Sequence, residues 1–118
     1  MRENVIKIKS FDFALRIVKL SKFLQNKKEF VLSKQILRSG TSIGAMVREA
    51  EHGESKADFI HKMAIAQKEA NETMYWLELL YQADFFNKKM FDSMQNDLVE
   101  IQKILSSIII SCKTGIKA

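Results

Sequence analysis

The stretch of sequence that determines the fold is residues 59–80, FIHKMAIAQKEANETMYWLELL. Its small and apolar residues recur at alternating spacings of four and three, which place them on one face of a helix. These residues are Phe59, Met63, Ala66, Ala70, Thr73, Leu77 and Leu80. Just before them, Ser55 and Asp58 resemble a capping box, so we expect a helix over about residues 56–84. Heptad spacing of this kind suits the nearly parallel helix axes of a bundle.

Three further helices are predicted around this stretch. Residues from about 90 to 113 carry an apolar stripe with the same spacings, and so do residues from about 32 to 52. Gly53 is expected to end the second of these, because glycine tolerates the left-handed backbone that closes a helix. A shorter stripe through Phe13 and Ile17 predicts a helix over about residues 10–25, with Ser10 as its N-cap.

The composition agrees with a single all-α domain over residues 1–118. The chain has no proline and only four glycines, 47% of its residues are hydrophobic and 28% are charged. The expected connections are short, so consecutive helices should be antiparallel neighbours in an up-down-up-down four-helix bundle. No apolar run is long enough to span a membrane and no export signal is seen. The single cysteine, Cys112, excludes an internal disulfide framework and fits a reducing cytoplasm.

Small residues predict a close approach of two helices. When the 32–52 and 56–84 helices are folded back to back about Gly53, Gly40 lies opposite Ala66 or Ala70. The same pairing puts Gly44 opposite Met63. Because these side chains are small, the two backbones are expected to come close at this point.

Charge is distributed unevenly along the chain, whose net formal charge is +5. Residues 1–38 hold ten Lys or Arg against three acids, a net of +7, whereas residues 49–84 hold three lysines against eight acids, a net of −5. The first segment predicts a phosphate-binding surface. Its candidate nucleic-acid-binding residues are Arg16, Lys19, Lys22, Lys27, Lys28, Lys34 and Arg38. The alternatives are solvated faces, or a scaffold in which the basic surface of one copy meets the acidic surface of another.

Catalytic and metal sites are not predicted. Glu49 with His52, and Asp58 with His61, have the i, i+3 spacing of bundle metal sites, but the further carboxylates of a two-metal site are missing. A zinc site formed by Cys112 with the two histidines is an equally weak alternative. Cys112 lies on an apolar stripe, where a cysteine is usually inert. The sequence thus indicates no enzyme, cofactor or small-molecule substrate.

Apolar residues outside the main stripes predict self-association. A small bundle is not expected to bury all of them, and contiguous exposed apolar surface usually marks an interface. They are Ile65, Trp76, Leu79, Phe85, Phe86, Ile109 and Ile110. Tyr75 with Trp76 could alternatively form a stacking platform for bases, although packing is the commoner use of such residues.

Between about Ser10 and Cys112 the chain resembles a bacterial four-helix-bundle family, first noticed as open reading frames in intervening sequences of 23S ribosomal RNA genes. The motifs that carry the resemblance are Gly40-Thr-Ser-Ile-Gly-Ala, Arg48-Glu-Ala, Ser55-Lys-Ala-Asp-Phe-Ile, Lys62-Met, Ile65-Ala, Lys68-Glu-Ala and Glu72 to Trp76-Leu. Met46 departs from the pattern, since the family often has Asn there. The resemblance implies a homopentameric ring without enzymatic activity. In architecture it extends to the basic accessory bundles of diversity-generating retroelements, which implies RNA or another nucleic acid as a partner.

Overall fold

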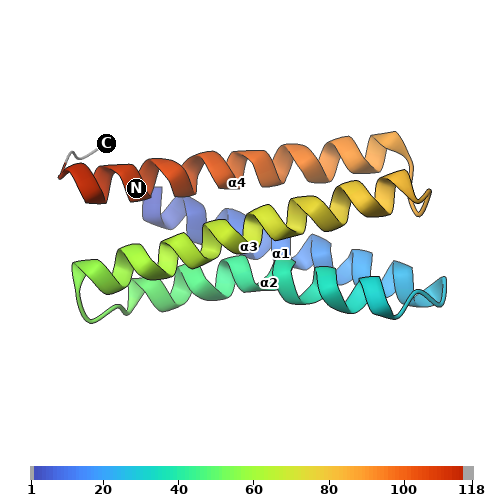
Figure 1. The fold of residues 1–118 in the computed structure, drawn as a ribbon, viewed down its shortest axis with the longest axis horizontal. Coiled ribbons are helices and arrows are strands. Elements are labelled where there is room, and N and C mark those ends of the chain that lie inside the picture. Colours follow the sequence, from blue (N-terminus) through green and yellow to red (C-terminus); the bar gives the residue numbers. More distant parts are fainter. Residues whose placement is uncertain (1, 116–118) are drawn as a thin grey trace.

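The computed structural model describes residues 2–115, which form four α-helices joined by short connections (Figure 1). The helices are α1 (Arg2–Asn26), α2 (Val31–Glu51), α3 (Lys56–Gln82) and α4 (Lys88–Thr114). Consecutive helices run antiparallel and α4 returns beside α1, so each helix packs against two neighbours. The prediction of an all-α, up-down-up-down bundle is confirmed for these residues. Residues 1 and 116–118 of the predicted domain lie outside the described part.

The predicted stripes of α3 and α4 form much of the core. In α3, Phe59 is half-buried and the other six stripe residues are buried. Thr73 is the one polar member of that stripe, and its hydroxyl lies 2.9 Å from the hydroxyl of Ser39 on α2. The Thr73 hydroxyl also lies 2.8 Å from the backbone oxygen of Glu69. Both buried hydroxyls are therefore hydrogen-bonded inside the bundle.

Helix α1 begins eight residues earlier than the sequence predicts, so the assignment of Ser10 as its N-cap is wrong. Ser10 is buried inside the helix, and its hydroxyl donates to the backbone oxygen of Lys7 at 3.3 Å. Ile6 is fully buried and extends the core stripe by two turns. Lys7 pairs with Glu51 of α2 at 3.1 Å, so charges that look like a solvated tail in the sequence bind a neighbouring helix instead.

The connection from α2 to α3 confirms one predicted cap and corrects another. Ser55 is the N-cap of α3, and its hydroxyl accepts from the backbone N–H of Asp58 at 3.0 Å. The prediction that Gly53 adopts a left-handed backbone is wrong. A glycine fits this position because there is little room for a side chain. A Cβ there would lie 3.1 Å from the backbone oxygen of Ala50 and 3.2 Å from the carboxylate of Asp58.

The α3–α4 connection starts earlier and ends earlier than predicted, so α3 is shorter and α4 longer than the sequence suggests. Asp84 has a φ of 67°, a left-handed conformation that cannot continue a helix, and α3 ends at Gln82 instead of residue 84. Helix α4 starts at Lys88 because the side chain of Asn87 accepts from the backbone N–H of Met90 at 2.9 Å.

Gly40 and Gly44 form a notch on α2 that faces α1, so the prediction that these glycines face α3 is wrong. A Cβ on Gly40 would come within 2.7–2.9 Å of three side-chain carbons of Ile17. A Cβ on Gly44 would lie 3.4 Å from the backbone of Ser10. The α3-facing position beside this notch belongs to Ser39, because its hydroxyl meets Thr73.

The apolar residues outside the main stripes differ in how much of their surface is exposed. Ile109 is buried, with 8% of its surface exposed, so its prediction as an outlying residue is wrong. Trp76, Phe85 and Phe86 are half-buried and pack against the core. Ile65 is half-buried as well, whereas Leu79 and Ile110 are exposed, as expected. In residues 2–115, no helix combines the length and apolar character needed to cross a membrane.

Candidate nucleic-acid interface

Arg16, one of the seven predicted phosphate-binding residues, is bound within the chain. Its guanidinium donates to Asp97 of α4 at 2.6 Å and to the hydroxyl and backbone oxygen of Ser93 at 2.9 and 3.4 Å. These bonds join α1 to α4. Because its donors already have oxygen acceptors, Arg16 is poorly placed to bind a phosphate.

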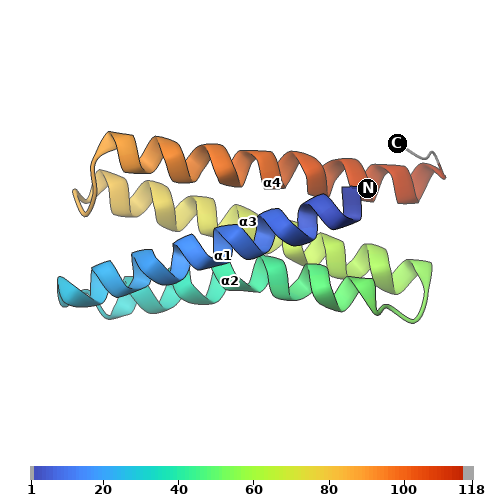
Figure 2. The same cartoon turned by 180° about the vertical axis from the view of Figure 1, so that it is seen from behind.

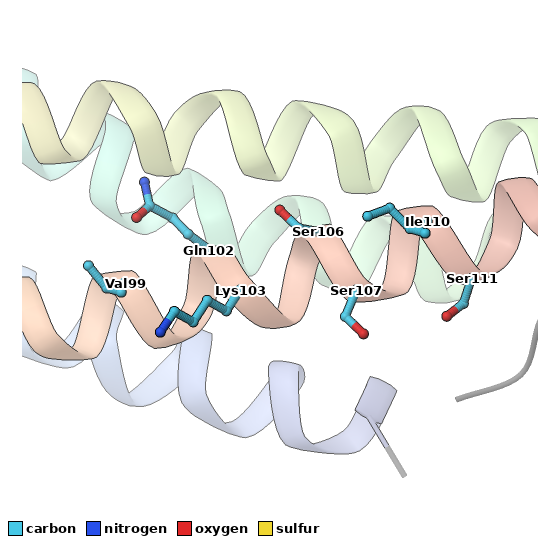
Figure 3. Close-up of a pocket in the computed structure, with 7 residues that line it drawn as sticks. All are labelled: Val99, Gln102, Lys103, Ser106, Ser107, Ile110 and Ser111. Atoms are coloured by element: carbon cyan, nitrogen blue, oxygen red, sulfur yellow. The ribbon is translucent and has the colours of Figure 1, made fainter.

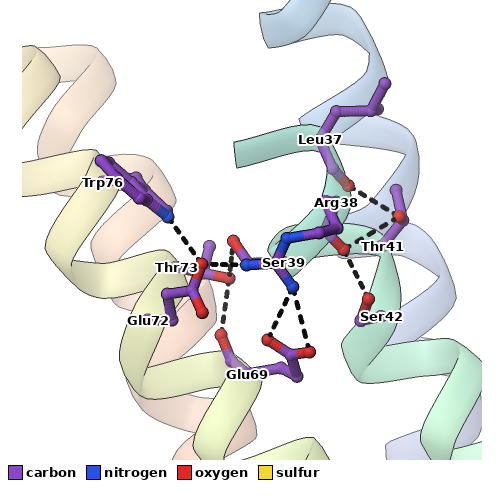
Figure 4. Close-up of polar contacts among 9 residues, drawn as sticks. All are labelled: Leu37, Arg38, Ser39, Thr41, Ser42, Glu69, Glu72, Thr73 and Trp76. Carbon is purple, nitrogen blue, oxygen red and sulfur yellow. Dashed lines mark hydrogen bonds and ion pairs between the residues drawn. The ribbon is translucent and has the colours of Figure 1, made fainter. Parts of the chain in front are cut away.

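Arg38 is also bound within the chain (Figure 4). Its guanidinium lies between two carboxylates of α3, 3.3 Å from both oxygens of Glu69 and in closer contact with Glu72. Glu72 additionally accepts from the indole N–H of Trp76 at 2.9 Å. Arg38 therefore holds α2 against α3. Tyr75 is exposed, but Trp76 packs against the core and its indole N–H is bound to Glu72. These contacts argue against the Tyr75–Trp76 platform for bases.

The other five predicted residues are lysines of α1, α2 and the turn between them, and all five are exposed: Lys19, Lys22, Lys27, Lys28 and Lys34. In the described part of the chain, none of them lies within ion-pair distance of a carboxylate, unlike the paired lysines Lys7, Lys9, Lys62 and Lys88. The Lys27 ammonium lies 5.0 Å from the centre of the Phe23 ring. We refer to these five residues as the hairpin lysines.

The turn that carries Lys27 and Lys28 is held in one conformation. Lys28 has a φ of 63°, and the N–H of Glu29 donates to the backbone oxygen of Leu24 at 2.9 Å. The Glu29 carboxylate accepts from the first two amides of α2, those of Val31 at 2.8 Å and Leu32 at 2.7 Å. A carboxylate at a helix N-terminus satisfies free amides and is stabilised by the helix dipole. The one acid of this turn is therefore already engaged.

Two lysines that are not among the hairpin lysines, Lys9 and Lys88, have raised pKa values. The hydrogen bond and charge of Glu100 raise the pKa of Lys9, and those of Asp92 raise the pKa of Lys88. Each pair's contribution to folding is fully present below the ordinary lysine pKa and is lost only as the pH rises through the raised value. Their carboxylate partners, Glu100 and Asp92, distinguish these two lysines from the hairpin lysines.

Part of the charge asymmetry is used within one chain. Three acids of the 49–84 segment pair with cations of the 1–38 segment: Glu51 with Lys7, and both Glu69 and Glu72 with Arg38. These pairs join α2 to α1 and α3. The paired residues are therefore less available for contacts between copies, whereas the hairpin lysines have no such pairing in the described part of the chain.

The candidate metal ligands Glu49, His52, Asp58 and His61 do not form a cluster. Glu49 pairs with Lys62 at 3.3 Å, and the Asp58 carboxylate accepts from the backbone N–H of Glu54 at 3.3 Å. A shallow hollow includes Glu49, His52 and Asp58 but not His61. Among residues 2–115, no three His, Cys, Asp or Glu side chains are grouped closely enough to hold a metal ion.

The outer face of α4 carries a second shallow hollow (Figure 3). It is lined by one helix alone, through Val99, Gln102, Lys103, Ser106, Ser107, Ile110 and Ser111. Gln102 donates to Asn71 of α3 at 2.9 Å, and Ser106 accepts from Gln67. The hollow is an open strip lined by both polar and apolar side chains, and its lining contains no acid or histidine.

Sequence reasoning missed the exposed aromatic residue next to the hairpin lysines. Phe30 is 61% exposed and is the residue from which α2 starts. The signal that could have revealed it is Glu29, whose spacing before Val31 and Leu32 suits a helix cap. With that cap, α2 starts at Val31 and Phe30 stays outside the stripe.

Comparison with known proteins gives consistent results. The family model described as 23S rRNA-intervening sequence protein matches residues 2–107. A similar solved structure is a protein of unknown function from the S23 ribosomal protein family of Bacteroides thetaiotaomicron; it is 60% identical, with coverage of 92% of this chain and 98% of that chain and a TM-score of 0.91. No curated protein matches the chain. Since the family model spans most of the sequence, the chain belongs to the 23S rRNA-intervening sequence protein family.

Proposed function

We propose that this protein is a non-enzymatic, oligomeric bundle of the cytoplasm that binds RNA through the hairpin lysines. The observation that carries the proposal is that, within residues 2–115, five exposed lysines on one helical hairpin lack carboxylate partners, while both candidate arginines have them. The family's link to intervening sequences of 23S rRNA supports RNA as the polyanion.

The chemistry is attraction between ammonium groups and phosphates. Lysines that neutralise phosphates release condensed counterions, so the affinity falls as the salt concentration rises. For a single strand, five contacts give a slope of log K against log salt of about −3.5. Contacts to phosphates carry no sequence information, so binding through these lysines should depend little on base sequence.

A matched pair of triple variants tests this proposal. Lys27→Gln, Lys28→Gln and Lys34→Gln together should weaken RNA binding by about tenfold or more and bring the salt slope to about −1.4, because two hairpin lysines remain. The control replaces Lys56, Lys68 and Lys113, three exposed lysines on α3 and α4, which changes the net charge equally. Fluorescence anisotropy with a single-stranded RNA at several salt concentrations gives both quantities.

Two results would contradict the proposal. One is equal loss of affinity in the two triple variants, which would mean that net charge alone attracts the RNA. The other is the absence of binding by the wild type even at low salt. In either case the hairpin lysines are a solvated face, and the alternative of a scaffold that binds only proteins becomes the better explanation.

The proposal includes assembly into a closed ring, with five copies as the family resemblance implies. Its support is an exposed apolar stripe on α1, the helix that lies in front of α3 in Figure 2. The Arg48 guanidinium of α2 lies 5.2 Å from the centre of one ring of the stripe, that of Phe11. The stripe consists of Val5, Ile8, Phe11 and Leu15, whose exposed fractions are 40, 61, 48 and 49%. Spacings of three and four place these residues along one side of the helix. Exposed apolar surface of this extent usually marks an interface, and a heterologous interface can close into a ring.

Charge in the α1 stripe should therefore break the assembly. We expect Phe11→Glu with Leu15→Glu to convert the oligomer to monomers without unfolding it, because both side chains are about half exposed in one chain. Val31→Glu, at a position 71% exposed outside the stripe, is the control and should keep the wild-type mass. Light scattering after gel filtration measures the mass. A monomeric wild type would refute the ring.

A further inference from the structure

The tip of the α1–α2 hairpin holds an aromatic ring in solvent. Phe30 is 61% exposed, and its side chain makes no cap for α2. Phenylalanine is a poor choice at a helix N-cap, where Ser, Thr, Asp or Asn would satisfy the free amides. Glu29 does this work instead, so the Phe30 ring is not needed to build the hairpin.

The backbone that carries this ring is held in one conformation. The Phe30 backbone is helical, with φ −98° and ψ −19°, and it lies between the Glu29 cap and the first turn of α2. The bond from the Glu29 N–H to Leu24 closes the turn on its other side. A ring on a rigid turn binds a flat partner at a lower entropic cost than a ring on a mobile loop.

Lysines surround this ring in the sequence and along the helix. Lys27 and Lys28 precede it by three and two residues. Lys34 follows it by four residues, which is one turn along the same side of the helix. Phe23, 41% exposed, is a second aromatic residue of the hairpin, with the Lys27 ammonium over its ring. Phosphate-binding and base-stacking groups thus alternate at the tip.

Resting on the proposed RNA-binding function, we infer that the hairpin tip binds single-stranded RNA, with one base stacked on the Phe30 ring. Lys27, Lys28 and Lys34 hold the neighbouring phosphates. An unpaired base offers its face to an aromatic side chain, whereas the bases of a duplex are already stacked on each other. A symmetric contact between two copies at the tip is disfavoured, because it would bring like charges together.

The test compares one RNA in two forms. Anisotropy is measured with a labelled oligouridylate alone and after it has been annealed to oligoadenylate. Phe30→Leu keeps an apolar side chain but removes the aromatic face. It should weaken binding of the single strand about tenfold, because the stacking of one base is lost, and leave duplex binding unchanged. Phe30→Trp should keep or increase the affinity for the single strand.

The outcomes separate this inference from the proposed function. If Phe30→Leu leaves single-strand binding intact while the hairpin-lysine variant weakens it, the stacking inference is wrong and RNA binding stands. If the wild type binds neither form, both are wrong. If Phe30→Leu changes the mass in light scattering, the tip is an interface between copies and the inference falls. Circular dichroism of each variant ensures that the comparison is made between folded proteins.

Discussion

Ile6→Ala should lower the free energy of unfolding by about 2–5 kcal/mol, the range for truncating a buried isoleucine. Ile6 is fully buried although it lies only a few residues from the start of α1. Removing its side chain leaves a cavity between helices and takes away the apolar contact that holds the first turns of α1 in place. Urea unfolding followed by circular dichroism measures the loss.

Ile8→Ala is the matched control, because it makes the same chemical change two residues away. Ile8 is 61% exposed, so its replacement should change the stability of one chain by no more than about 0.5 kcal/mol. Any larger effect of Ile8→Ala should depend on protein concentration, since Ile8 belongs to the α1 stripe. Equal and small losses in the two variants would show that α1 does not dock before Ser10.

Gly40→Ala is expected to destabilise the bundle by about 1–2 kcal/mol. The added Cβ would lie under 3.0 Å from three carbons of Ile17, including the branch at its own Cβ, which is stiff. Ile17 is fully buried, so relief requires α1 and α2 to move apart. Overpacking costs about 1–3 kcal/mol. The gain of about 1 kcal/mol from alanine in a helix offsets part of that cost.

Gly44→Ala separates the steric effect from helix propensity. The nearest atoms to its added Cβ belong to Ser10 and lie at 3.4 Å, an ordinary contact. This variant should therefore be stabilised, by up to about 1 kcal/mol. In the double variant Gly40→Ala with Ile17→Ala, the loss should be smaller than the sum of the single losses, because the second change makes room for the first. Additive losses would refute the Gly40–Ile17 contact.

The fold was predictable wherever a residue's role depends only on neighbouring residues of the same helix. The α3 stripe from Met63 to Leu80 and the Ser55 cap were correct, because heptad spacing and capping are local properties. The start of α1 was not, because Lys7 and Lys9 find their acids on α2 and α4. The partner of Gly40 was also missed, since small residues mark a close approach without indicating which helix comes close.

The candidate site was predictable as a group of charges but not residue by residue. Arg16 and Arg38 look like the hairpin lysines in the sequence. Their carboxylate partners lie 81 and 31 residues away, and only the packed bundle brings them together. Phe30 escaped notice because it lies in the connection before α2 and belongs to no apolar stripe.

The buried pair of Ser39 and Thr73 has a consequence for the register of the bundle. Heptad stripes alone would allow α3 to slide along α2 by one turn and still bury apolar surface. After such a slide, Ser39 would face Ala70 or Leu77. The hydrogen bond between Ser39 and Thr73 would then be lost. A lost bond of this kind costs about 0.5–1.5 kcal/mol, and more where a buried hydroxyl is left unsatisfied. Several registers of α3 against α2 would bury similar apolar surface, and the Ser39–Thr73 hydrogen bond favours one of them.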